Sequence, residues 1–201
     1  SVFEKVGRIP KYSPNATLNR WKGEAKAWLD VSYTNKDTVI DGLIAAATSH
    51  LDGWSGILGR CLCEQTWRQD FDRFARCLRI PLAPVISITS VKYDDESGDE
   101  QTIDSADYEL LNDDLGPYVK FLDTYAFPAI HDERPAVRVA YLAGYPTVTG
   151  AWSGPDDIKH AIALLVRNWF DNPSAVNVGN IVNVMPLGFD ALIAKHRRVR
   201  F

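Results

Sequence analysis

The sequence predicts an α+β fold in which a small helical bundle carries an inserted antiparallel β sandwich or barrel. Apolar residues recur at steps of three and four over residues 36–58 and 156–171, which is the spacing of an amphipathic helix. Between these segments the pattern changes to a period of two, interrupted by Pro, Gly and Asp, which is typical of short strands and turns. With 201 residues, 46% of them hydrophobic, the chain is long enough to bury a sizeable core.

The N-terminal residues 1–20 carry two prolines, scattered charges and no clear period. They predict an extended arm that is ordered only where something holds it, ahead of a domain spanning residues 21–201. The apolar residues of the arm leave a second interpretation open, in which it straps a partner: Val2, Phe3, Val6 and Ile9. A short helix over residues 22–29 follows, with Ala25, Trp28 and Leu29 on its buried side.

The first long helix is predicted over residues 36–58, with Asn35 and Asp37 as candidate N-terminal caps. Ala46 and Ala47 are small enough to let another helix approach closely. Its apolar stripe consists of Val39, Ile40, Leu43, Ile44, Ala47, Leu51, Trp54, Ile57 and Leu58.

The inserted β region is predicted over residues 63–143. Its clearest strand is Val85–Tyr93, which is rich in β-branched residues, and an acidic turn over 95–100 predicts a hairpin. Short strands separated by turn residues indicate an antiparallel sandwich or barrel and not a parallel sheet. The other predicted strands are 64–71, 77–80, 101–103, 108–111, 118–122 and 137–142.

The chain then returns to helix over residues 156–171, whose apolar face is broad enough to predict contacts on two sides. A last helix is predicted over residues 187–195, followed by a basic tail, 196–201. The loop between these helices is unusually apolar for a solvent loop, which predicts that it packs against something: Val176, Val178, Ile181 and Val182.

Charge is unevenly distributed along the chain. The net charge of −4 argues against a protein that coats nucleic acid. The segment Asp94–Asp114 has ten acidic residues and no Lys or Arg, whereas no acidic residue follows Asp190. No apolar run reaches the length needed to span a bilayer, so we expect no membrane association.

A search for chemistry predicts no catalytic site, no metal and no cofactor. Cys61, Cys63 and Cys77 lack a fourth ligand at zinc-site spacing, and three thiols fit a reducing compartment. The segment 131–133 (His-Asp-Glu) is interpreted as solvated loop charge, and the acids of 94–100 do not match the spacing of an EF-hand loop. Nucleophile-elbow, P-loop and dinucleotide motifs are missing from the sequence.

Over residues 22–201 the chain resembles the head–tail connector (adaptor) proteins of long-tailed bacteriophages and related gene transfer agents. The likeness rests on the order and spacing of many motifs, each weak alone. The arm 1–20, Cys61 and Cys63 fall outside the pattern. The motifs include Asp37-x-x-Ile40-x-x-Leu43-Ile44-x-Ala46-Ala47, Leu51-Asp52-x-Trp54, Gly59-Arg60-x-Leu62, Gln65-Thr66-Trp67, Ile80-Pro81-Leu82-x-Pro84-Val85, Val137-Arg138-Val139 with Ala143-Gly144-Tyr145, and Pro186-Leu187-Gly188.

The resemblance implies a structural virion protein without catalysis. Such adaptors are similar in forming a homo-oligomeric ring, expected to be a dodecamer, under the portal protein. The ring extends the channel through which double-stranded DNA leaves without specific binding, and it docks stopper or tail-completion proteins. The implied location is the head–tail interface of the virion, after assembly in the bacterial host cytoplasm.

Two sets of residues follow as site hypotheses. The resemblance implies that the C-terminal segment engages the portal: Lys195, His196, Arg197, Arg198, Val199, Arg200 and Phe201. Surplus apolar and small residues suggest a subunit interface: Ala46, Ala47, Val176, Val178, Ile181 and Val182. Two alternatives remain open, a DNA-binding protein that uses the basic tail and a carbohydrate-binding accessory module built on the β insertion, Trp152 and residues 131–133.

Overall fold

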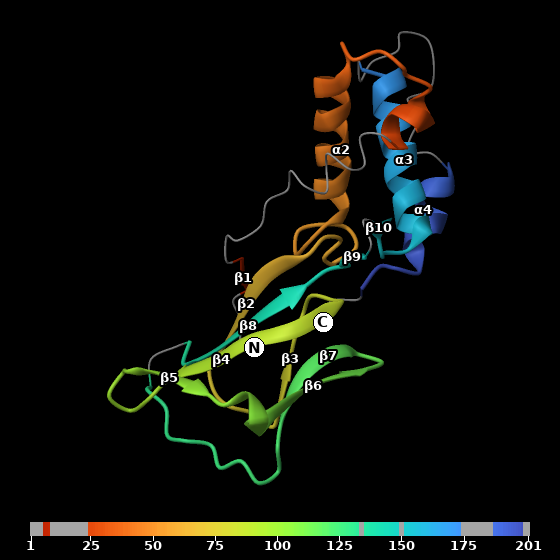
Figure 1. Ribbon diagram of the computed structural model, residues 1–201. Helices are drawn as coiled ribbons and strands as arrows, with labels where there is room; N and C mark the ends of the chain where they lie inside the picture. Colours follow the sequence, from red (N-terminus) through yellow and green to blue (C-terminus); the bar gives the residue numbers. More distant parts are fainter. Residues whose placement is uncertain (1–5, 9–23, 133–134, 149–150, 174–186, 199–201) are drawn as a thin grey trace. The chain divides into compact units, whose positions relative to one another are not determined.

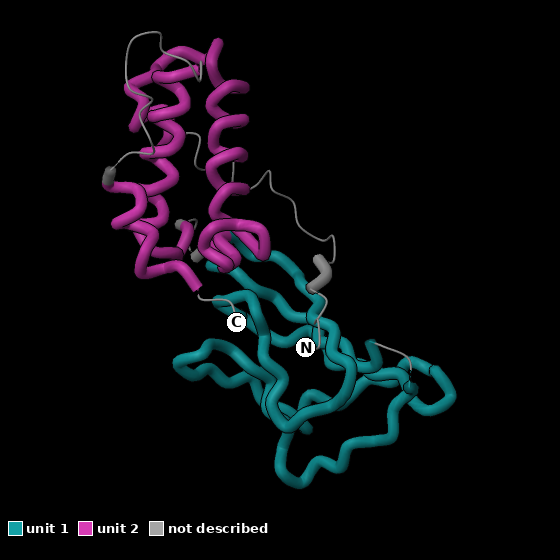
Figure 2. The backbone as a smooth tube through the Cα atoms, turned by 180° about the vertical axis from the view of Figure 1, so that it is seen from behind, with its two compact units in different colours: residues 1–12, 63–145, 200 teal, residues 13–62, 146–199, 201 magenta. Residues whose placement is uncertain are grey.

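The computed structural model describes residues 6–8, 24–132, 135–148, 151–173 and 187–198. The chain divides into two compact units (Figure 2). The sheet unit comprises residues 1–12, 63–145 and 200, and the helical unit comprises residues 13–62, 146–199 and 201. The mixture of helices with antiparallel sheets confirms the predicted α+β class.

The sheet unit contains a five-stranded sheet in which all neighbouring strands are antiparallel (Figure 1). Its central strand β8 alternates buried and half-buried residues, as expected of a strand with one face in the core. The pairing of β4 with β8 shifts register twice, between Val85 and Ser87 and between Ile88 and Ser90. In spatial order the strands are β1 (Val6–Arg8), β2 (Gln65–Phe71), β8 (Val137–Ala143), β4 (Val85–Asp94) and β5 (Glu100–Ile103).

A second, three-stranded sheet completes the unit. Its order is β3 (Cys77–Arg79), β7 (Gly116–Phe121) and β6 (Tyr108–Asp113), and the short 3-10 helix η1 (Ser105–Asp107) precedes β6. In the described part of the sheet unit the strands therefore form two open sheets, so the barrel alternative was wrong. All predicted strands of the insertion are present, with ends that differ by two residues at most.

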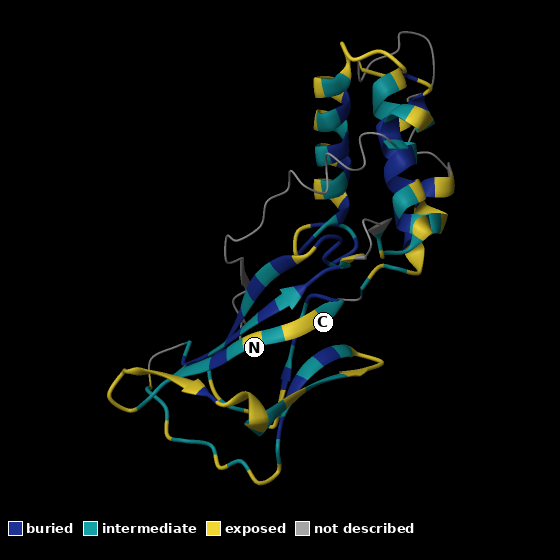
Figure 3. Ribbon diagram, in the orientation of Figure 1, coloured by how far each residue is buried: buried dark blue, intermediate teal, exposed yellow. Residues whose placement is uncertain are grey.

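Aromatic rings fill one end of the sheet unit. Phe121 on β7 is fully buried, and its ring contacts those of Phe74, Tyr125 and Phe127 at centroid distances of 5.8, 5.6 and 5.2 Å. Phe74 also meets Tyr93 of β4 at 5.4 Å, so these rings join elements of both sheets. Figure 3 shows buried stretches on β2, β8 and β7.

The helical unit is built around α3 (Asp156–Asp171), which packs against both α2 (Asp37–Leu51) and α4 (Leu187–Ala194). Residues 24–29 are also helical, with Ala25 and Leu29 buried as predicted. The ribbon of β9 (Thr147–Val148) and β10 (Ala151–Trp152) leads into α3. The broad apolar face of α3 is confirmed by its buried residues Ile158, Ala161, Ile162, Ala163, Leu165 and Val166.

The predicted helix over 36–58 was wrong at its C-terminal end, because α2 stops at Leu51. Asp52 adopts an extended conformation (ψ 146°), and its carboxylate accepts from the Leu62 amide at 2.6 Å. Gly53 follows at a φ of 75°, and a Cβ on Gly56 would lie 2.4 Å from the backbone of Leu51. The glycines and Asp52 therefore turn the chain back where the apolar pattern continued.

Two further expectations need correction, those for the stripe on α2 and for Trp152. Val39 and Trp54 were assigned to the buried stripe, but they are 50% and 41% exposed. Val39 lies on the side of α2 that faces away from α3, and α2 ends before Trp54. Trp152 was assigned to a loop but lies in β10, where its indole N–H donates to the Leu62 carbonyl at 2.7 Å. Within the arm 1–20, Val6–Arg8 forms a strand of the large sheet.

Candidate assembly surfaces

The described residues hold no group of three or more His, Cys, Asp or Glu side chains placed to bind a metal ion. Cys61 and Cys63 are buried, Cys77 is exposed, and none of the three forms a disulfide.

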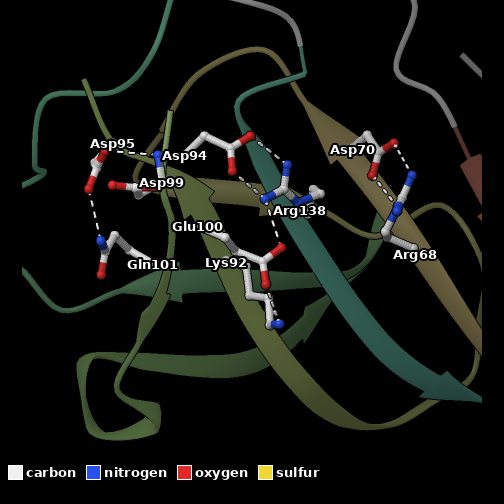
Figure 4. A network of polar contacts seen from close by, with 9 residues as sticks. All are labelled: Arg68, Asp70, Lys92, Asp94, Asp95, Asp99, Glu100, Gln101 and Arg138. Carbon is white, nitrogen blue, oxygen red and sulfur yellow. Dashed lines mark hydrogen bonds and ion pairs between the residues drawn. The ribbon is translucent and has the colours of Figure 1, made fainter. Parts of the chain in front are cut away.

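Two acidic residues at the tip of β4 and β5, Asp94 and Glu100, are paired with cations from β4 and β8 (Figure 4). Arg138 on β8 donates to both carboxylate oxygens of Asp94, at 2.6 and 2.5 Å, and to Glu100 at 3.0 Å. Lys92 donates to the other oxygen of Glu100 at 2.5 Å. The Arg138 guanidinium lowers the pKa of Asp94, and Lys92 lowers the pKa of Glu100.

Asp95 organises the turn itself. Its Oδ1 accepts from the amides of Ser97 and Asp99 at 3.0 and 3.1 Å, and its Oδ2 accepts from Gln101 at 2.8 Å. These bonds hold the pKa of Asp95 below its ordinary value of 3.8, with the Gln101 bond as the largest cause. The carboxylates of Asp94, Asp95 and Glu100 thus form ion pairs or hold the turn, as expected at the tip of a hairpin.

A shallow polar cavity of about 720 Å³ lies beside this network. Arg68 lines it while holding Asp70, whose side chain is 1% exposed, through contacts of 2.8 and 3.0 Å. The charged groups that line the cavity already form ion pairs, so the cavity presents no excess of positive or negative charge to a ligand. His131 of the 131–133 segment lies here, Asp132 is exposed, and Glu133 lies outside the described residues. The lining residues are Arg68, Asp94, Gly98, Glu100, His131, Pro135 and Arg138.

The basic tail folds back on the helical unit over its first part. Lys195 Nζ lies 2.5 Å from Asp157 Oδ2, and His196 Nε2 lies 3.3 Å from the same oxygen. Arg197 donates to Asp190 at 3.2 Å. The pKa of Asp157 is lowered, first by Lys195 and then by His196. Two of the predicted docking cations therefore already have acidic partners within the chain.

The backbone of the tail is held as well. Arg60 Nε donates to the His196 carbonyl at 2.7 Å, and the Arg198 amide donates to the Leu58 carbonyl at 3.0 Å. Sequence reasoning missed this anchoring, because the pairs join residues more than a hundred positions apart. Val199, Arg200 and Phe201 lie outside the described residues.

One face of α2 is exposed and uncharged, and we call it the outer face: Val39, Gly42, Ala46 and Ser49. These positions follow one another at steps of three and four, so they lie in one row along the helix. A Cβ added at Gly42 would meet nothing within 4 Å. Gly42 was missed at the sequence level, although its spacing of four from Ala46 is a visible signal.

Ala46 and Ala47 were predicted to share an interface, but the structure separates them. Ala46 is exposed on the outer face, whereas Ala47 is fully buried in the packing of α2 within the subunit. The prediction that Ala47 contacts a neighbouring subunit directly was therefore wrong. Adjacent helical residues point about 100° apart, so Ala46 and Ala47 lie on different faces of α2. Val176, Val178, Ile181 and Val182 lie outside the described residues.

The two alternative functions gain no support from these surfaces. The indole N–H of Trp152 bonds to the backbone within the helical unit, and the ring is not an exposed platform for sugar. Lys195 and Arg197, the tail cations considered for DNA, face Asp157 and Asp190. Among the described helices, none is long and apolar enough to cross a membrane.

No protein-family model and no curated protein matches the chain. Solved structures do match it. The neck of an empty gene transfer agent particle computed with C6 symmetry contains a chain with a TM-score of 0.74 and 21% identity, covering 98% of this chain and 97% of that chain. A chain in the neck of the native particle, computed with C12 symmetry, matches with a TM-score of 0.72 and 20% identity, over 98% of this chain and 97% of that chain. A chain in the virion of the native gene transfer agent particle matches with a TM-score of 0.73 and 20% identity, over 98% of this chain and 96% of that chain. This chain is therefore similar in fold, over nearly its whole length, to chains of gene transfer agent necks.

Proposed function

We propose that this chain is a head–tail adaptor, a structural protein without catalytic activity in the neck of a phage or gene transfer agent particle. The observation that carries the proposal is the extent of the structural likeness, which covers 98% of this chain and 97% of a neck chain. Both the sheet unit and the helical unit fall within that coverage. A likeness limited to one unit would have indicated a shared module and not a shared role.

The proposed assembly is a ring of identical subunits below the portal, with twelve subunits as the expected number. A ring needs heterologous interfaces, in which two different faces of the subunit meet. The outer face of α2 suits one of them, because it has no charge to desolvate and only small side chains around Gly42 and Ala46. The apolar segment that includes Val176, Val178, Ile181 and Val182 remains the proposed second contribution.

Double-stranded DNA is proposed to pass through the ring without being held. Each Lys or Arg that contacts a phosphate adds affinity through counterion release, which would slow the passage of DNA. A net charge of −4 per subunit, repeated around a ring, gives a repulsive field instead. The ion pairs of Lys195 with Asp157 and of Arg197 with Asp190 further reduce the cationic character of the tail.

The C-terminal segment is proposed to dock on the portal, with stopper or tail-completion proteins on another surface of the ring. The contacts of residues 195–198 fix where the tail leaves the helical unit. The terminal Val199, Arg200 and Phe201 would then be presented from a defined point. A fixed point of departure reduces the entropy lost when these residues bind a partner.

The experiment that tests the function is a mass measurement of the purified full-length chain, alone and with the portal protein of the same particle. A ring, or a ring that forms only on the portal, is the expected result. A chain that stays monomeric and does not bind the portal at micromolar concentrations would overturn the proposal.

Two deletions test the role of the tail. Removing residues 199–201 leaves the contacts of residues 195–198 in place, so thermal unfolding should not change while portal binding is lost. Removing residues 195–201 should also abolish binding and, in addition, lower stability, because Arg60 and Asp157 lose their partners. Unchanged portal binding by both deletions would refute the docking role without affecting the ring.

A further inference from the structure

Strand β1 covers one edge of the five-stranded sheet, next to β2. It is only three residues long and pairs antiparallel with β2 through Val6↔Gln69, Gly7↔Arg68 and Arg8↔Trp67. A pairing this short is marginal by itself, because few backbone hydrogen bonds offset the loss of chain entropy. The strand therefore depends on how strongly the edge of β2 needs a partner.

The edge of β2 needs a cover. Five of its seven residues are buried, and these include the polar Gln65, Gln69 and Asp70. Without β1, the outward backbone N–H and C=O groups of residues 67–69 would be left beside this buried strand with nothing but solvent to pair them. An open edge of this kind is also a template for uncontrolled pairing with other chains. A strand paired with β2 removes that open edge.

The chain does not reach this edge through a hairpin. After β1 it passes through residues 9–23 and the first part of the helical unit, and it returns to β2 only at Gln65. The fifteen residues of 9–23 span up to about 50 Å when extended. A compact unit of about 100 residues has a radius of gyration of about 13 Å, so the same sheet edge on an adjacent subunit is within reach.

We propose that in the assembled ring β1 of each subunit pairs with β2 of the adjacent subunit. This inference rests on the proposed ring. The three residue pairs of β1 and β2 are identical in either arrangement, so the exchange keeps the backbone pairing of the described strand. In a closed ring every β2 edge then receives one strand. Because the adjacent subunits already touch through another face, the exchanged strand binds at high effective concentration. Val6–Arg8 thereby links one subunit to the next.

Paired cysteines test the inference directly. Opposed residues of an antiparallel pair have Cα atoms about 4.5 to 5.5 Å apart, which is within the range of a disulfide. One variant carries Gly7→Cys and Arg68→Cys together with Asp70→Asn, which removes the buried charge that Arg68 matches. A second variant carries Val6→Cys and Gln69→Cys and leaves that ion pair intact. All variants carry Cys77→Ser, since Cys77 is an exposed thiol.

Rings are oxidised and run on a denaturing gel without reductant. Exchange gives a covalent ladder in steps of one 22.5 kDa chain, and more than half of the protein should leave the monomer band. A matched control carries Glu109→Cys and Lys120→Cys, a pair within the hairpin of β6 and β7, and it should stay at the monomer position. In mixed rings, a chain with only Gly7→Cys and a chain with only Arg68→Cys and Asp70→Asn should form a covalent dimer.

The outcomes separate the two levels of the proposal. If rings form but both cysteine pairs yield only internally linked monomers, each subunit keeps its own strand, and the inference is overturned while the ring stands. If no ring forms with or without the portal, the proposed function fails and the exchange fails with it. A ladder in either variant, with the control at the monomer position, supports the exchange.

Discussion

Replacing Gly42 by Ala should stabilise the isolated subunit and weaken the ring. Gly42 lies in the middle of α2 with nothing within 4 Å of an added Cβ, so the methyl group meets no obstacle within the subunit. Glycine inside a helix is less stable than alanine by roughly 0.5 to 1 kcal/mol, because it loses more backbone entropy on folding. For a chain of this size that gain raises the Tm by about 2 to 4 °C per kcal/mol.

In the proposed ring the same methyl group would stand between α2 and the neighbouring subunit. Extra volume in a tightly packed contact costs about 1 to 3 kcal/mol. Each interface should therefore weaken by roughly 5- to 150-fold. Sedimentation velocity over a range of protein concentrations measures the shift from rings to monomers, and circular dichroism of the dilute monomer measures the Tm.

Gly188→Ala is the matched control. Gly188 is an exposed glycine in α4, where the added Cβ would approach only Leu164 at 3.9 Å, an ordinary contact. It should give a similar or smaller stabilisation and no change in assembly. If Gly42→Ala raises the Tm and leaves the assembly curve in place, the outer face of α2 is not at a subunit interface. Ala46→Glu gives an independent check, since it should keep the fold and abolish rings.

Three further variants or conditions probe the subunit itself. Arg138→Gln should lower the free energy of unfolding by about 1 kcal/mol in urea titrations, because Asp94 and Glu100 lose a charged donor that is partly screened by solvent. Both carboxyls have a lowered pKa in the folded chain, so the stability they provide is complete above their ordinary values of 3.8 and 4.5 and is lost as the pH falls through the lower folded values. The unfolding free energy should therefore be level above about pH 5 and fall below about pH 4. Arg138→Gln should make that fall shallower. A slope identical to that of the wild type would show that Arg138 does not lower the pKa of these carboxyls. Trp152→Phe should cost about 1 kcal/mol through the lost bond to the Leu62 carbonyl, measured as a lower Tm, and an unchanged Tm would show that the bond contributes nothing.

Much of the fold was predictable from local patterns. The β-branched run Val85–Tyr93 and the acidic turn after it predicted the β4–β5 hairpin, because period and turn chemistry act over a few residues. The end of α2 was not predictable in the same way. Apolar residues continue at helical spacing to Leu58. The positive φ of Gly53, the close approach of Gly56 to Leu51 and the bond from the Leu62 amide to Asp52 show why the helix stops before that.

The assembly surfaces were less accessible to sequence reasoning. Charge alone identified the basic tail, but its ion pairs with Asp157 and Asp190 depend on how α3 and α4 pack. Helical periodicity placed Ala46 and Ala47 together, whereas the packing of α2 on α3 separates an exposed position from a buried one. Strand β1 carries no periodic signal in three residues, and its partner lies far along the chain.

The chain enters and leaves the sheet unit at adjacent points. Cys63 and Tyr145 form a parallel bridge, and Gly144, at a φ of 120°, approaches so closely that a Cβ there would lie 2.0 Å from the Cys63 carbonyl oxygen. A segment whose two ends lie next to each other can be removed or replaced, because a short turn can bridge the gap that it leaves. Insertions and replacements between residues 64 and 144 can therefore change the sheet unit while the helical unit keeps its own sequence. A shortened chain that begins at residue 13, and in which a two-residue turn joins Cys63 to Tyr145, would deliver the helical unit without the sheet unit, as a starting point for grafting other sheet domains.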